Sequence, residues 1–323
     1  MGEPAISVVM PVYNGVKYVA EAVRSILGQT RGDFEFLAID DGSTDGSGEI
    51  LRRFAAEDGR IKLVSRENRG LTRTLNEAAE LARGEFIARM DADDVALPGR
   101  LAAQMEYMRA HPECGVVGGA VVCITAEGWE IDAWTPPGGH EAIDAGHIRG
   151  VPGGILHPTA LLRRSVLKQA GGYRDEWELA EDLDLWLRMA EVARVGNVGE
   201  VVLRYRMHAA SLSQARRREQ WERVWQVVRQ ARERRGLEAL PARKWPGGGG
   251  EKEVAERARR TWAVRAIVAG NYRTARRLAW QNLGATGVSR RSLGLVAGCA
   301  LGPVTRRILR RRVKSEGRDG AGG

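Results

Sequence analysis

The feature that most constrains this chain is an alternation, between residues 6 and 90, of short apolar runs with longer segments of helical periodicity. The runs are rich in β-branched and aromatic residues, which is typical of buried strands. Between them, apolar residues such as Val19, Ala22 and Val23 recur with the spacing of one helical face. Strands that alternate with helices predict an α/β fold with a mostly parallel, Rossmann-like sheet flanked by helices. The predicted strands are residues 6–10, 34–39, 61–64 and 86–90.

Polar clusters follow three of these predicted strands: Tyr13-Asn14, Asp40-Asp41 and Asp91-Ala92-Asp93-Asp94. Ligands of such sheets bind beyond the carboxyl ends of the strands, so we expect the clusters to converge on one crevice. A GxGxxG motif does not follow the first strand, and a GxxxxGK[ST] loop is also absent. Dinucleotide binding and a P-loop therefore lose their main support.

The aspartates have both a functional and a structural interpretation. Asp91 and Asp93 are one residue apart and can share Mg²⁺ or Mn²⁺, which prefer carboxylate oxygens and a diphosphate ligand. A carboxylate such as Asp40 or Asp41 can accept hydrogen bonds from a base or a ribose. The alternatives are an acidic loop in which Asp94 caps the next helix, and an ordinary turn.

Charge is distributed unevenly along the chain. Residues 1–214 carry 23 Lys and Arg against 32 Asp and Glu, a net charge of −9, and the remaining residues carry 27 against 9, a net charge of +18. The 43% hydrophobic content excludes overall disorder. A basic C-terminal part predicts contact with an anionic membrane leaflet or a nucleic acid.

The cysteines and the N-terminus bear on localisation. Cys114, Cys123 and Cys299 form neither an even set nor a CxxC motif, which favours a reducing compartment. We see no signal peptide and expect a cytoplasmic protein, peripheral on the inner face of the membrane if the basic part binds there.

Several motifs together resemble the family 2 glycosyltransferases, in the order and spacing of that family, over about residues 5–213. They are Ser7–Asn14, Ile39–Asp45, Glu67–Leu71, Gly84–Asp94, His157–Thr159, Gly171–Tyr173, Ala180–Trp186 and Tyr205–His208. The resemblance implies a GT-A fold and a hexosyltransferase-like enzyme that uses a nucleotide-diphosphate sugar, usually a UDP-sugar, with inversion at the anomeric carbon.

The resemblance also implies roles for residues of the first two clusters. By position, Pro11, Tyr13 and Asp41, together with Asp40, correspond to residues that hold the base and ribose.

Two further motifs carry the chemistry. Asp91 and Asp93 correspond to the DxD pair, with Asp93 the direct ligand of Mg²⁺ or Mn²⁺ and Asp91 a ribose or metal contact. Asp182 corresponds to the catalytic base. The helical pattern of residues 183–189 would place Asp182 at a helix N-terminus, which favours an ionised base. The alternative for Glu181-Asp182 is an ordinary helix cap.

One departure from the family bears on the product. Processive members carry Gln-x-x-Arg-Trp where this chain has Leu203–His208, and this difference favours transfer of a single sugar. We expect a lipid-linked or polysaccharide acceptor in cell-envelope glycan synthesis. The competing hypotheses are an inactive nucleotide-sugar or nucleic-acid binding protein and a nucleotidyltransferase.

The basic extension is predicted to be helical. Trp221, Val224, Trp225 and Val228 mark one face of a first helix, and two further helices follow at 254–269 and 272–283. The apolar stretch 292–304 is shorter than the roughly 20 residues that a membrane-spanning helix needs. The extension would lie on a leaflet or cap the catalytic domain, and no nucleic-acid motif supports the third option, nucleic-acid binding. The predicted boundaries are 1–213 for the catalytic domain, 214–314 for the extension with a linker near 241–250, and 315–323 for a disordered tail.

Overall fold

A computed structural model describes residues 3–208, 216–241, 251–286 and 290–309, and the chain divides into two compact units. Unit 1 comprises residues 1–121, 135–205 and 216–245, and unit 2 comprises residues 122–134, 206–215 and 246–323. This division differs from the predicted boundary at 213/214, because the first helix of the basic extension belongs to unit 1. The predicted tail 315–323 and residues 242–250 of the predicted linker lie outside the described residues.

The sheet has nine strands, in the order β3-β2-β1-β4-β8-β6-β9-β5, with β7 paired to β6. Strands β1 to β4 are mutually parallel, whereas β8 pairs antiparallel with β4 and β6, and β5 pairs antiparallel with β9. The bounds are β1 Ile6–Val12, β2 Phe34–Asp41, β3 Ile61–Arg66, β4 Phe86–Arg89, β5 Val95–Ala96, β6 Cys114–Thr125, β7 Glu130–Trp134, β8 Leu161–Arg163 and β9 Arg194–Met207.

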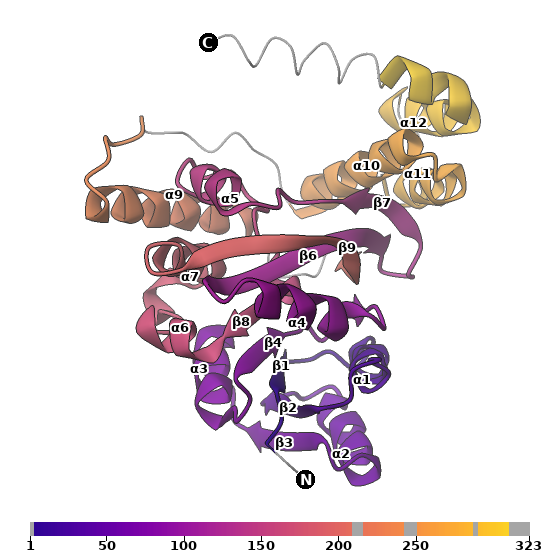
Figure 1. Ribbon diagram of the computed structural model, residues 1–323. Coiled ribbons are helices and arrows are strands. Elements are labelled where there is room, and N and C mark those ends of the chain that lie inside the picture. The colour runs from indigo at the N-terminus through magenta and orange to yellow at the C-terminus, as the bar shows by residue number, and fades with distance from the viewer. Residues whose placement is uncertain (1–2, 209–215, 242–250, 287–289, 310–323) are drawn as a thin grey trace. The chain divides into compact units, whose positions relative to one another are not determined.

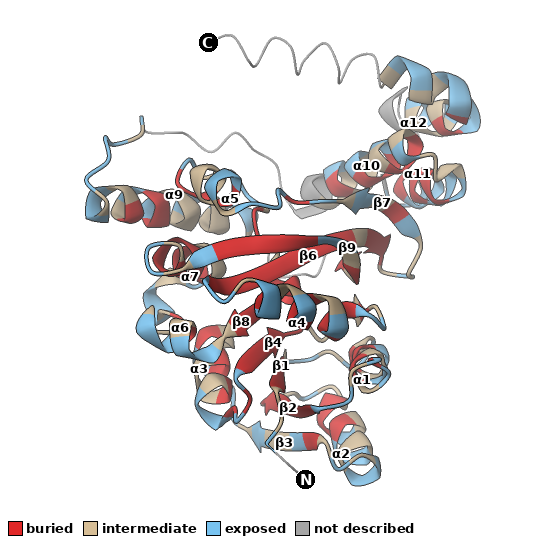
Figure 2. Cartoon of the chain, in the orientation of Figure 1, coloured by how far each residue is buried: buried red, intermediate tan, exposed pale blue. Residues whose placement is uncertain are grey.

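Helices flank the parallel strands, with α1 and α2 on one side and α3 on the other (Figure 1). The apolar faces of these helices and the strands between them form the core of unit 1, in which β1, β4 and much of β6 are buried (Figure 2). The bounds are α1 Val19–Leu27, α2 Ser47–Glu57, α3 Leu71–Leu81, α4 Arg100–Ala110, α5 His140–His147, α6 Arg164–Gln169 and α7 Glu181–Met189, with short 3₁₀ turns at His157–Thr159 and Asp175–Trp177. The predicted α/β fold of a sheet flanked by helices is confirmed.

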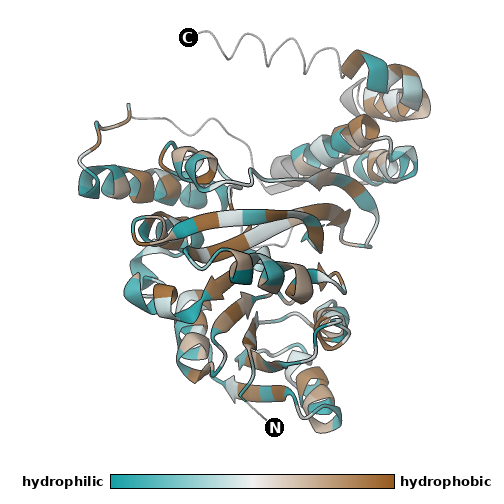
Figure 3. Cartoon of the chain, viewed as in Figure 1, coloured by the Kyte–Doolittle hydropathy of each residue, from teal (hydrophilic) through white to brown (hydrophobic). Residues whose placement is uncertain are grey.

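Helix α9 (Arg217–Arg234) packs within unit 1 against α7. Val227, Val228 and Ala231 are its buried residues, and Val227 and Ala231 join an apolar cluster that includes Leu187. Figure 3 shows the alternation of hydrophobic and hydrophilic residues along this helix. The predicted amphipathic helix is therefore present, and its apolar face covers part of the catalytic unit.

Arginines at the end of α9 pair with acidic residues of unit 1. Arg235 bridges Asp144 at 2.8 Å and Glu191 at 3.0 Å, and Arg234 contacts Glu191 at 2.8 Å. Some of the basic residues of the extension therefore neutralise acidic residues of the body, which accounts for part of the opposite charge of the two ends of the sequence.

Among its described residues, unit 2 contains a helical hairpin and two further helical segments, 290–300 and 302–309. The helices α10 (Glu251–Ala269) and α11 (Tyr272–Thr286) contact each other on either side of Gly270, whose φ of +98° suits glycine at this turn. The predicted helices 254–269 and 272–283 are thus confirmed. Helix α12 (Arg290–Ala300) overlaps the apolar stretch 292–304, and among the described residues no helix is long and apolar enough to cross a membrane.

Candidate active site

The loops that follow β1 and β2 are tied to each other by hydrogen bonds. The Thr44 N–H donates to Asn14 Oδ1 at 2.9 Å, and the Val16 N–H donates to Asp45 Oδ2 at 2.9 Å. Asn14 adopts a positive φ of 51°, which asparagine tolerates better than most residues. The two polar clusters therefore lie next to each other at the carboxyl ends of adjacent parallel strands.

Three of the predicted nucleotide contacts lie at the ends of these two strands. Pro11 is half-buried on β1, and Tyr13 just beyond the strand is 57% exposed, so its ring is accessible to a ligand. Asp40 pairs in register with Val12 and is buried, and its Oδ1 accepts the Ser43 N–H at 3.0 Å.

Asp41, in contrast, pairs with other groups of the protein. Its buried carboxylate forms an ion pair with Arg66 and accepts the N–H groups of Arg69 and Gly70 at 2.8 and 3.0 Å. These contacts anchor the segment between β3 and α3. Sequence reasoning did not identify Arg66, although its position at the end of a predicted strand, beside the Glu67–Leu71 motif, was a usable signal.

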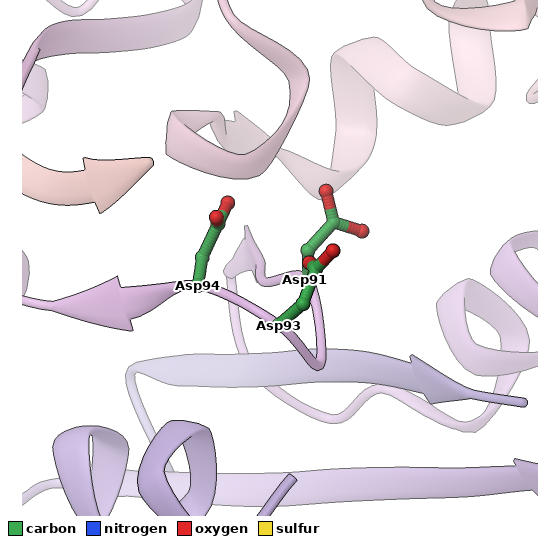
Figure 4. Close-up of side chains that lie close together, drawn as sticks. All are labelled: Asp91, Asp93 and Asp94. Atoms are coloured by element: carbon green, nitrogen blue, oxygen red, sulfur yellow. The ribbon is translucent and has the colours of Figure 1, made fainter. Parts of the chain in front are cut away.

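Asp91, Asp93 and Asp94 form a carboxylate cluster at the end of β4 (Figure 4). Each residue offers one oxygen, and the three oxygens lie within 4.8 Å of one another. Hard oxygen ligands in this arrangement fit Mg²⁺ or Mn²⁺. Asp94 does not cap the next helix, because α4 begins after Gly99 at its N-cap position.

Arg89 is a buried cation of the site, and sequence reasoning missed it. It is 3% exposed and forms an ion pair with Asp91. Burial raises the pKa of Asp91, repulsion from Asp93 adds to the rise, and Arg89 opposes it. The usable signal was an arginine within the apolar run 86–90.

Glu181 and Asp182 occupy the first turn of α7, as the helical pattern predicts. Ala180 is the N-cap residue of α7, and the Asp182 side chain accepts one hydrogen bond from an N–H of the same first turn. Burial, followed by repulsion from Asp182, raises the pKa of Glu181 to about 7. Burial also raises the pKa of Asp182, whereas the Leu183 N–H, which donates to Asp182 Oδ1 at 2.7 Å, and the nearby Arg89 lower it.

These charges form one electrostatic cluster. Arg89 lowers the pKa values of Asp91, Glu181 and Asp182, and Asp91 raises that of Asp182. The fold therefore brings the predicted DxD aspartates and the predicted base into the same part of unit 1, where the buried Arg89 acts electrostatically on both.

His157, the first residue of the motif His157–Thr159, has a structural environment. Its Nε2 hydrogen-bonds the Tyr173 hydroxyl at 2.9 Å, and its ring meets Trp186 edge-on with centroids 5.8 Å apart. Burial lowers its pKa well below the ordinary range, so the imidazole is neutral.

Comparisons with known proteins identify the family of this chain. The family model "Glycosyl transferase family 2" matches residues 7–171. The chain is 34% identical over 210 residues to the O-antigen biosynthesis glycosyltransferase WbnJ of Escherichia coli, a match that covers 64% of this chain and 81% of the relative.

Solved structures share the fold. S. aureus TarS 1-349 in complex with UDP-GlcNAc aligns with a TM-score of 0.57 at 18% identity, over 98% of this chain and 92% of that chain. The mannosyltransferase PcManGT of Pyrobaculum calidifontis in complex with GDP-Man and Mn²⁺ aligns with a TM-score of 0.53 at 21% identity, over 93% and 81%. The fold, the motifs at the strand ends and the match to the family model place this chain in glycosyltransferase family 2, and it is a glycosyltransferase with a GT-A fold.

Proposed function

We propose that this glycosyltransferase transfers a single sugar, with inversion and with the help of Mg²⁺ or Mn²⁺, from a nucleotide-diphosphate sugar to a glycan or lipid-linked acceptor. The observation that carries the proposal is the proximity of the carboxylate cluster Asp91, Asp93 and Asp94 to Asp182 within one electrostatic network. We favour a UDP-sugar as the donor. The structures of TarS in complex with UDP-GlcNAc and of PcManGT in complex with GDP-Man and Mn²⁺ support a nucleotide-diphosphate sugar as the donor class.

The chemistry divides between the two groups of carboxylates. Asp93, with Asp91, would hold the cation, which when bound stabilises negative charge on the departing diphosphate. Asp182 takes the proton of the acceptor hydroxyl as that oxygen bonds to the anomeric carbon and the bond from this carbon to the diphosphate oxygen breaks. The Leu183 N–H, 2.7 Å from Asp182 Oδ1, fixes the orientation of this carboxylate.

The donor site has residues for each part of the nucleotide. The exposed ring of Tyr13 offers a flat surface for a base, and Asp40 offers carboxylate oxygens for a base N–H or ribose hydroxyls. Because Asp41 is engaged by Arg66 and two backbone N–H groups, we propose that it supports the nucleotide site by fixing the segment between β3 and α3.

Calorimetric titration of UDP and GDP into the protein tests the donor site. The titrations are run with Mn²⁺, with Mg²⁺ and with a chelator, in the wild type and in Asp93→Ala. We expect metal-dependent binding that Asp93→Ala weakens. Nucleotide binding that persists unchanged with chelator and in Asp93→Ala would contradict the metal role, and no binding under any condition would favour an inactive binding protein.

We also propose that the acceptor belongs to cell-envelope glycan synthesis and that unit 2 lies on an anionic membrane surface on the cytoplasmic side. The name of the E. coli relative, which refers to O-antigen biosynthesis, supports the pathway class. Leu301, Val304 and Ile308 are each more than half exposed, and Arg306 and Arg307 lie among them. Apolar side chains interspersed with arginines suit the interface of an anionic leaflet.

Vesicle sedimentation tests this surface. Replacing Leu301, Val304 and Ile308 by serine should release the protein from vesicles that contain phosphatidylglycerol. The matched control Leu81→Ser, which removes an exposed apolar side chain from unit 1, should leave binding unchanged. Equal sedimentation of the triple variant and the wild type would refute the proposal for this surface.

A further inference from the structure

Unit 1 contains a cavity of about 430 Å³ whose walls come from α7, α9 and the segment after α5. This volume lies within the range of about 300–1,000 Å³ that small-molecule sites occupy. Asp182 on α7 is one of the lining residues, whereas Glu181 is not. The cavity therefore gives access to the proposed base. One of its walls is formed by α9, which lies beyond residues 7–171 that the family model matches.

Two buried ring nitrogens in the walls of this cavity lack a hydrogen-bond partner. His147 is 2% exposed and Trp186 is 1% exposed, and both line the cavity. Neither His147 Nδ1 nor Trp186 Nε1 has a partner among the residues that the structure describes. Buried polar atoms are nearly always hydrogen-bonded, so these two leave the wall of the cavity with unused hydrogen-bonding capacity.

The charge state of His147 fits a neutral ligand. Burial lowers its pKa to about 4, with Arg235 adding to the fall and Asp144 opposing it. The imidazole is therefore neutral at cellular pH and offers one donor and one acceptor nitrogen, whereas Trp186 offers only a donor. Hydroxyl groups, which both donate and accept, suit this pair.

Two tryptophans of α9 line the same cavity. Trp221 and Trp225 are one helical turn apart, both half-buried, with ring centroids 5.9 Å apart and an interplanar angle of 62°. The ring of Trp225 lies against Gly150, where a Cβ atom would stand 3.1 Å from it. Gly150, with a φ of +72°, thus leaves room for the ring to lie flat against the backbone and holds its position.

We propose that this cavity binds a neutral sugar residue of the acceptor, with Trp221 and Trp225 as its aromatic platform. A pyranose combines an apolar C–H face with a rim of hydroxyls, and the walls combine flat aromatic surface with buried hydrogen-bonding nitrogens. In this position an acceptor hydroxyl reaches Asp182. The proposal rests on the assignment of Asp182 as the base, and it makes α9 a determinant of acceptor specificity.

Binding of methyl glycosides, followed by saturation-transfer difference NMR, tests the cavity. The probes are methyl glycosides of glucose, galactose, rhamnose and N-acetylglucosamine, each added to the protein with UDP and Mn²⁺ and without them. We expect at least one glycoside to bind the wild type through its C–H protons. Trp225→Ala should weaken that binding about tenfold, and Trp225→Phe should restore most of it because the ring is retained.

Trp280→Ala is the matched control, because Trp280 is a 61% exposed tryptophan of α11 that does not line the cavity. It should leave glycoside binding unchanged. Thermal unfolding of each variant, followed by circular dichroism, identifies any loss of fold, and the Trp225→Phe variant gives the answer if Trp225→Ala unfolds.

The outcomes separate this proposal from the proposed function. If no glycoside binds the wild type under either condition, or if binding is the same in Trp225→Ala and the wild type, the cavity is not the acceptor sugar site. Octanol binding that Trp225→Ala weakens, without glycoside binding, would overturn the proposal in favour of a lipid chain. Glycoside binding that depends on Trp225 in a protein that binds neither UDP nor GDP would support the cavity and refute the donor site.

Discussion

Glu181 gives the prediction that follows most directly from the structure. It is 7% exposed, and burial together with repulsion from Asp182 raises its pKa from an ordinary value of 4.5 to about 7. At about 1.4 kcal/mol for each pKa unit, ionisation of Glu181 in the folded protein costs about 3 kcal/mol more than in the unfolded chain. The neutral isostere in Glu181→Gln removes this cost.

The sign of the pH dependence follows from the direction of the shift. Below the unfolded pKa of 4.5 both states carry the proton, and the free energy of unfolding has no contribution from this ionisation. As the pH rises towards 7, the unfolded chain releases the proton first, and the wild type loses stability. The difference in unfolding free energy between Glu181→Gln and the wild type should therefore grow by about 3 kcal/mol, with most of the change between pH 5 and pH 8.

Urea denaturation of both proteins at a series of pH values, with a chelator present, measures this difference. The cost of burying the glutamine amide does not change with pH. It therefore cancels when the difference between Glu181→Gln and the wild type at one pH is subtracted from the difference at another pH. Glu200→Gln, which neutralises an exposed glutamate of unit 1, should show no such growth. A difference between Glu181→Gln and the wild type that stays constant from pH 5 to pH 8 would refute the reasoning.

Two further variants test neighbouring parts of the site. Arg89→Met removes the cation that lowers the pKa of Asp182, so the acid limb of the pH profile of kcat/KM should move to higher pH, and an unchanged limb would contradict the electrostatic role of Arg89. Asp41→Asn removes the charge that pairs with Arg66, which keeps its second partner Glu77, and weakens the bonds from two backbone N–H groups, so it should cost about 1.5–3 kcal/mol of unfolding free energy. Urea denaturation checks this value, and a loss below about 1 kcal/mol would mean that Asp41 is not structural.

The parallel half of the sheet and the position of the site were predictable because both depend on local patterns. Apolar runs of strand length, separated by helical periodicity, fix β1 to β4, and the geometry of parallel strands brings Asp40 and Asp91 to one edge. The antiparallel strands β8, β6, β9 and β5 were not predicted, since their pairing joins segments far apart in the sequence and leaves no periodic signature.

The contacts that charged groups make inside the protein were also not predictable from the sequence. The pattern cannot show that Asp41 is held by Arg66 and two backbone N–H groups, or that Arg89 pairs with Asp91, because these contacts depend on side-chain directions in the folded protein. The same applies to α9. Its amphipathic pattern indicated a helix, but only the structure shows that Trp225 lines a cavity that Asp182 also lines.

The central claim is that Asp182 removes the proton of the acceptor while other residues hold the donor. The most direct test is to compare Asp182→Asn with the wild type in two measurements, sugar transfer from a UDP-sugar and calorimetric affinity for UDP with Mn²⁺. Loss of a general base should reduce kcat by about 10²–10⁴-fold, and UDP affinity should remain that of the wild type. Transfer by Asp182→Asn at the rate of the wild type would contradict the claim.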